Sequence, residues 1–206
     1  MNTRNFILSA AALIALCVPS VFAQQTDTSS TATPTDKPAT IAQRKDNQQD
    51  RIAQGIDSGQ LTSGETKNLE TKEADVNKEE HTLRTDDDGH LTAADRAKLN
   101  NQQNHLSNQI YDDKHNANTA HYGNGEIGQR RENQQDRIAQ GVKSGQLTAG
   151  ETSRLENREQ GINREVSADK QANGGKLTGA DRKAINQSQN RASRSIYRDK
   201  HNGARR

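Results

Sequence analysis

From residue 41 onward, large hydrophobic residues are sparse and recur at intervals of three, four or seven positions. The recurring sets are Leu69, Val76 and Leu83, then Leu99, Leu106 and Ile110, and the pair Ile52 and Ile56. Residues at these intervals fall on one side of an α-helix, in a narrow stripe closer to a coiled-coil seam than to a broad core face. No segment shows the alternation of apolar and polar residues that is typical of a half-buried strand.

The stripes predict three helices, at about 41–57, 63–84 and 93–116. The chain then repeats itself: residues 41–116 align without gaps with residues 127–202, and 41 of the 76 paired positions are identical. The same three helices are therefore predicted 86 positions later. Repetition on this scale indicates repeated supersecondary units. We predict an all-α fold of two tandem three-helix modules with long amphipathic helices.

A phrase of the form Gly-x-Leu-Thr-x-x-acid occurs four times and explains where the helices begin. Threonine can cap a helix, and an acid three residues later can bond back to the threonine amide, which together make a capping box. The glycine suits a left-handed residue just past the preceding helix, as at Gly59. The predicted capping pairs are Thr62 with Glu65, Thr92 with Asp95, Thr148 with Glu151, and Thr178 with Asp181.

The predicted core is thin. Twelve large side chains are available to the first module, namely Ile41, Ile52, Ile56, Leu61, Leu69, Val76, Leu83, Leu91, Leu99, Leu106, Ile110 and Tyr111. Burying them offsets only part of the conformational entropy lost when 76 residues are ordered. We expect an isolated module to be marginally stable, and we expect module to pack on module or chain on chain.

The first 40 residues have a different composition. Residues 1–23 have a positive start at Arg4, an apolar run too short to span a bilayer, and Val-Phe-Ala at the end, which predicts a signal peptide. Leu16 precedes Cys17 where a lipoprotein signal would have a small residue. Residues 24–40, rich in Ser, Thr and Pro, predict a disordered linker, and the Gly/Asn-rich stretch 117–126 predicts a second linker. The protein is thus expected to be exported, to the periplasm or outside the cell.

The sequence gives no sign of catalysis. The only cysteine lies in the signal peptide, so the mature chain offers neither disulfides nor thiolate ligands for zinc. No metalloprotease motif, phosphate loop or nucleophile elbow occurs, and little apolar surface is available to line a water-excluding cleft. We predict no catalytic and no cofactor-binding residue. The histidines near the predicted helix ends, such as His115 and His201, suit the helix dipole without a metal.

One stretch, 85–95 (TDDDGHLTAAD), is distantly similar to an EF-hand calcium loop. With Gly89 as the sixth loop position, the candidate ligands are Asp86, Asp88, His90, Thr92 and Asp95. Arg84 stands at the first position, where a carboxylate is needed, and the other three phrases offer no carboxylate at positions one, three and five. A solvated turn is the preferred interpretation, with weak calcium binding as an alternative.

Charge divides the two modules. Residues 41–116 hold 10 basic and 15 acidic side chains, a net charge of −5, whereas residues 127–206 hold 17 and 9, a net charge of +8. Charged residues usually form the solvated faces of helices. Opposite net charges on two copies of one unit nevertheless favour docking of one module on the other, within a chain or between chains. The basic, arginine-rich module could also contact an anionic surface.

The pattern NQQDRIAQG, GQLTxGE, LTxAD and IYxDKHN resembles a family of uncharacterised exported bacterial helical-repeat proteins. The resemblance implies helical repeats and a secreted or periplasmic location, with no activity or site to carry over. The composition, with a mean hydropathy of −1.16, is similar to that of hydrophilins. We expect an exported, non-catalytic protein that acts by binding or structural association. The alternatives are a hydrophilin-like stress protectant and an EF-hand-like calcium binder.

Overall fold

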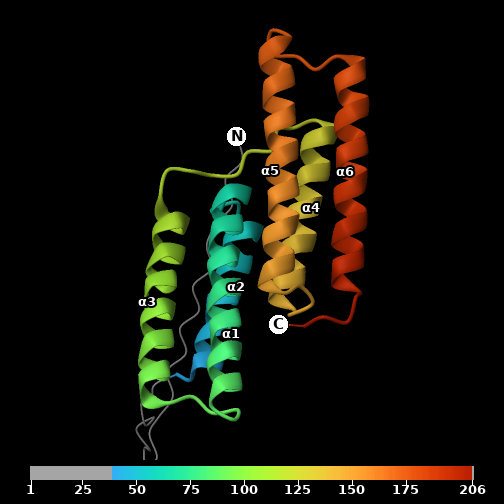
Figure 1. Ribbon diagram of the computed structural model, residues 1–206. Coiled ribbons are helices and arrows are strands. Elements are labelled where there is room, and N and C mark those ends of the chain that lie inside the picture. The colour runs from blue at the N-terminus through green and yellow to red at the C-terminus, as the bar shows by residue number, and fades with distance from the viewer. Residues whose placement is uncertain (1–38, 206) are drawn as a thin grey trace, which may run out of the picture. The chain divides into compact units, whose positions relative to one another are not determined.

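The computed structural model describes residues 39–205, and it is helical throughout its regular structure (Figure 1). The predicted signal peptide and nearly all of the first predicted linker lie outside the described residues. The helices are α1 (Ile41–Asp57), α2 (Ser63–Asp86), α3 (Ala93–His115), α4 (Glu126–Lys143), α5 (Ala149–Ala172) and α6 (Gly179–Lys200). No strand occurs between residues 39 and 205, which confirms the all-α prediction. Every predicted helix end lies within two residues of the observed end.

The helices form two sets of three that face each other through α1, α2, α4 and α5. Helix α3 packs on α1 and α2, and α6 packs on α4 and α5. Between the sets, α1 packs on α4 and α2 packs on α5 (Figure 1). The helices that face across the middle therefore occupy equivalent places in the two sequence repeats.

Equivalent positions meet across this interface in an antiparallel sense. Gly64 on α2 lies beside the Gln160 side chain of α5, and the Ser153 hydroxyl donates to the Lys67 carbonyl oxygen at 3.4 Å. Residue numbers thus rise along α2 as they fall along α5. Ser153 is itself the repeat counterpart of Lys67, so the crossing point lies near a local twofold axis. This is the pattern of a symmetric, isologous dimer contact, made here within one chain.

The largest hydrophobic cluster is shared by both sets of helices. Its buried members are Ile52, Ala53, Ile56, Leu61, Leu69, Leu106, Ile110, Ile138, Ala139, Val142, Leu147, Leu155 and Ile196. Two smaller clusters lie toward the far ends of the sets, one around Leu99 and the other around Ile185. The core prediction was wrong for one residue: Tyr111 is 58 % exposed, and its ring stacks on the His115 ring.

Buried glutamines add polar contacts between the helices of each set. The Gln48 amide donates to the Gln103 carbonyl oxygen at 2.7 Å, and the Gln134 amide donates to the Gln189 carbonyl oxygen at the same distance. Both glutamines are nearly inaccessible to solvent. A buried amide group is costly unless it is bonded, so these contacts favour one register of α3 on α1 and of α6 on α4.

All four repeated phrases form capping boxes. The Thr62 amide donates to the Glu65 carboxylate at 2.9 Å, and the Glu65 amide donates back to the Thr62 hydroxyl at 3.3 Å. The pairs Thr92 with Asp95, Thr148 with Glu151, and Thr178 with Asp181 have the same reciprocal geometry. Gly59 has φ +68°, in the left-handed region that glycine adopts without strain. Helix α4, which follows Gly125 and has no side-chain cap, is the exception.

Candidate functional site: an arginine groove on the second module

Arginines gather on the outer side of α5 and α6 because their spacing leaves them opposite the core. On α6, Ile185, Ala192 and Ile196 face inward and are buried. Arg191, Arg194 and Arg198 follow a spacing of three and four and are exposed on one stripe of the helix.

These α6 residues share a surface groove with arginines from two other helices. Arg137 comes from α4 and Arg158 from α5. The groove is lined by Arg137, Arg158, Arg191, Ser193, Arg194, Ser195, Tyr197 and Arg198, and we call it the arginine groove. No carboxylate lines it. Its residues could hold a group with several negative charges, because guanidinium groups bind phosphate or carboxylate oxygens through paired N–H donors.

The first module lacks this concentration of positive charge. The positions equivalent to Arg137, Arg158, Arg191, Arg194 and Arg198 are occupied there by Arg51, Lys72, His105, Asn108 and Asp112. The last three of these are exposed, as their counterparts are. Because α3 and α6 pack in the same way with different outer residues, the fold does not require arginine at these positions.

Carboxylate partners are scarce around the groove. Between residues 39 and 205 there are four ion pairs, and three of them lie within the first module. The fourth joins Arg198 Nε to the Asp199 carboxylate at 3.0 Å. Arg191 donates to the Ser188 hydroxyl at 2.9 Å, and Arg137 to the Ser193 carbonyl oxygen at 3.3 Å. Most of the groove's charge is therefore available to an external anion.

Tyr197 lines the groove and is 62 % exposed. It stacks on His201 with ring centroids 4.2 Å apart, and the His201 Nδ1 lies 2.6 Å from the Tyr197 carbonyl oxygen. Tyr111 and His115 make the same pair at the end of α3. The repeated Tyr and His therefore close the last turn of a helix, which agrees with a structural role for these histidines.

A second polar cluster is buried between the modules, and sequence reasoning missed it. Burial raises the pKa of Glu156 to about 7, although hydrogen bonds from Gln135 and Ser63 oppose the shift. Burial also raises the pKa of Glu159 to about 8, helped by the charge of Glu156 and opposed by Arg131. Both glutamates fall on the inner side of α5, three residues apart. Helical spacing alone could have flagged this pair.

Arg131 and Tyr122 complete that cluster from α4 and the connector before it. The Arg131 guanidinium lies 5.2 Å from the Tyr122 ring centroid, a cation–π geometry, and burial lowers its pKa. Burial, followed by the charge of Glu156, raises the pKa of the Tyr122 phenol. The composition of residues 117–126 predicted a simple linker, yet its tyrosine packs against α4.

The candidate calcium ligands of the acidic turn at 86–95 do not form one cluster in the structure. The Asp95 carboxylate accepts from the Thr92 amide at 2.9 Å as part of the cap, and hydrogen bonds from Thr92 lower its pKa. The Arg84 guanidinium donates to the Gly89 carbonyl oxygen at 3.4 Å. Asp86, Asp88 and His90 are exposed. Over residues 39–205, no three His, Asp or Glu side chains gather closely enough to hold a metal ion. Calcium binding stays an untested prediction.

Comparison with family models, curated proteins and solved structures gives no match to this chain. In the part of the chain that the structure describes, none of the helices has the length and apolar character needed to cross a membrane. The arginine groove therefore has to be interpreted from its own chemistry.

Proposed function

We propose that this protein is an exported, non-catalytic helical protein that associates with an anionic partner through its second module. The observation that carries the proposal is the arginine groove, where five arginines from three helices line one surface without a lining carboxylate. Surfaces of this kind attract polyanions over a distance set by the ionic strength. The groove is open rather than enclosed, which suits a surface or a polymer better than a small substrate.

The fold supplies a rigid base for this surface. Arg191, Arg194 and Arg198 stand on a helix whose inner side is fixed by Ile185, Ile196 and the buried Gln189. The helix that carries the arginines is thus fixed before a partner arrives, which reduces the backbone entropy lost on binding.

Retention on an immobilised polyanion, such as a heparin column, tests the proposal. The variant Arg191→His with Arg194→Asn carries the first module's residues at two groove positions, and we expect it to elute at clearly lower salt than the wild type. The matched control is Lys78→Asn with Arg96→Asn, which removes two exposed cations from the first module. It has the same net charge as the groove variant and should elute close to the wild type. Equal elution of the two variants would show that net charge alone governs retention.

Export is tested separately from binding. Mass spectrometry of the protein recovered outside the cytoplasm should show a chain that starts at Gln24. A chain that begins at Met1, or at a lipidated Cys17, would contradict the predicted signal peptide.

A further inference from the structure

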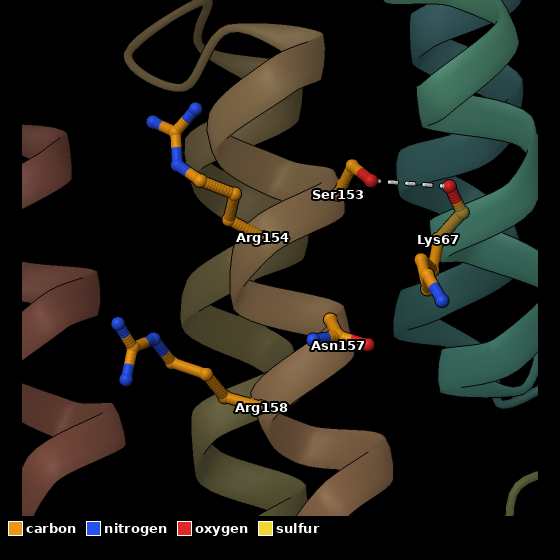
Figure 2. A pocket seen from close by; sticks show the side chains of 5 residues that line it. All are labelled: Lys67, Ser153, Arg154, Asn157 and Arg158. Atoms are coloured by element: carbon orange, nitrogen blue, oxygen red, sulfur yellow. Dashed lines mark hydrogen bonds between the residues drawn. The ribbon is translucent and has the colours of Figure 1, made fainter.

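The arginine groove continues across α5 to α2. A neighbouring groove is lined by Lys67, Ser153, Arg154, Asn157 and Arg158, and Figure 2 shows Arg154 and Arg158 extending on the same side of α5. Because Arg158 lines both grooves, the positive side chains form one continuous band over three helices. We call this set the cationic band, and it consists of Lys67, Arg154, Arg158, Arg191, Arg194 and Arg198.

The band has the dimensions of a phosphate backbone contact. Arg191 and Arg198 are seven residues apart, which is about 10 Å along a helix. Each strand of a DNA duplex presents one phosphate per about 3.4 Å of axis, so α6 alone spans several phosphates. Arg154 and Arg158, one turn apart on α5, extend from α5 on the side that faces α6, and Lys67 lies on the other side of α5, on α2 (Figure 2).

The side chains around the band disfavour two other kinds of contact. Among the residues described, the only large hydrophobic side chains that are exposed are Tyr111 and Tyr197. Single-stranded nucleic acids are usually bound through several stacked aromatic rings, and helices that lie on membranes bury an apolar face in the lipid. The cationic band offers neither feature. A partner of the cationic band must therefore be recognised through charges on the partner's own outer surface.

We propose that the cationic band binds double-stranded nucleic acid through its phosphates, without reading the bases. A duplex is a linear polyanion whose charges all lie on the outside, and cations spread over three neighbouring helices can contact several successive phosphates. The inference rests on the proposed function, which requires an anionic partner but does not name its class.

Fluorescence anisotropy with a short labelled DNA duplex tests the inference on the full mature chain. The logarithm of the binding constant should fall linearly with the logarithm of salt concentration, with a slope of about −4.5 to −5.4 for five or six phosphate contacts. This slope predicts an affinity loss of roughly 500- to 2,000-fold between 50 and 200 mM salt. Duplexes of different sequence should bind equally well, because no base contact is involved.

The groove variant, Arg191→His with Arg194→Asn, should reduce the slope by about 2, one unit for each lost phosphate contact. The control variant, Lys78→Asn with Arg96→Asn, should keep the wild-type slope. Circular dichroism of both variants would show whether the helices are retained. Duplex binding that is equally strong in the groove variant and the wild type would overturn the assignment of the band.

A parallel measurement with vesicles that contain phosphatidylglycerol separates this inference from the proposed function. Binding to vesicles through the same arginines, with no duplex binding at low salt, would overturn the nucleic-acid inference and leave the proposed function standing. Binding to neither probe, together with no retention on the heparin column, would overturn both.

Discussion

The hydroxyl oxygens of Thr71 and Ser153 lie 2.7 Å apart where α2 crosses α5. Ser153 is the repeat counterpart of Lys67, and the two residues meet near the local twofold axis. A homodimer of the first module would instead place Lys67 opposite Lys67, where like charges repel. The crossing is therefore better suited to one copy of each module than to two copies of the first.

The two modules, made as separate chains of residues 41–116 and 127–206, should associate with each other. Docking would restore the shared hydrophobic cluster, which each module alone leaves partly exposed. The ion pairs of Glu79, Glu80 and Asp199 each lie within one module, so salt should weaken association mainly by screening the opposite net charges of the two modules. Isothermal titration at low and moderate salt measures both effects. An absence of heat and of co-elution at low salt would contradict the prediction.

Replacing both Thr62 and Thr148 by alanine should lower stability by about 1 kcal/mol per site, because each change removes the cap acceptor of a helix amide. A thermal melt followed by circular dichroism measures the loss. It should be the same with calcium and with a chelator. A loss confined to calcium-loaded protein would favour a ligand loop over a capping motif.

Gly128→Ala should destabilise the protein by about 1–3 kcal/mol. A Cβ atom at this position would lie 2.1 Å from the Gly123 carbonyl oxygen and 2.4 Å from that of Tyr122, and both are backbone atoms that cannot rotate away. The equivalent residue of the first module is already alanine, Ala42. Urea unfolding measures the change.

A matched control for that variant is Gly161→Ala, inside α5, where a Cβ atom would have no neighbour within 4 Å. Alanine should stabilise the helix there by up to about 1 kcal/mol. Similar destabilisation by both substitutions would show that contact with the connector is not the cause at Gly128.

Stability should fall as pH rises from about 5 to 8. The pKa of Glu156 is raised to about 7 and that of Glu159 to about 8, from an ordinary value of 4.5. In this interval the folded protein holds protons that the unfolded chain releases, so raising the pH favours unfolding. The stabilisation that comes from the protonated glutamates is fully present below about pH 4.5, and it is lost as the pH rises through the raised pKa values. Arg131 on α4 and the Tyr122 phenol face the same cluster.

Glu156→Gln should flatten this pH dependence, because the amide keeps a hydrogen-bonding group of similar shape without a titrating proton. At pH 8 the variant should be more stable than the wild type by roughly 1–3 kcal/mol. The exposed Glu132→Gln is the control and should leave the pH profile unchanged. Chemical unfolding at several pH values compares the three proteins, and a profile for Glu156→Gln parallel to the wild type would contradict the assignment.

Local rules were enough to predict the helices. The caps at Thr62 and Thr148 depend on residues three positions apart, and the stripe of Leu99, Leu106 and Ile110 depends on helical spacing, so both are visible in one sequence. The inward glutamates Glu156 and Glu159 were not predicted, because charged residues are normally assigned to the solvent face. Tyr122 was missed because its partner, Arg131, is reached only when the connector folds back on α4. The sequence showed the net positive charge of the second module. It could not show that the arginines of the groove, which come from α4, α5 and α6, lie together.

The local twofold contact between the modules has an evolutionary consequence. In a dimer of identical subunits, each substitution appears twice, so a basic face on one subunit requires the same face on the other. Joining both copies in one chain removes that restriction. His105, Asn108 and Asp112 occupy one copy of a surface that carries Arg191, Arg194 and Arg198 in the other. The chain keeps the core of a symmetric pair, while its two modules carry net charges of opposite sign. The protein is therefore an electric dipole, and a charged surface would orient it.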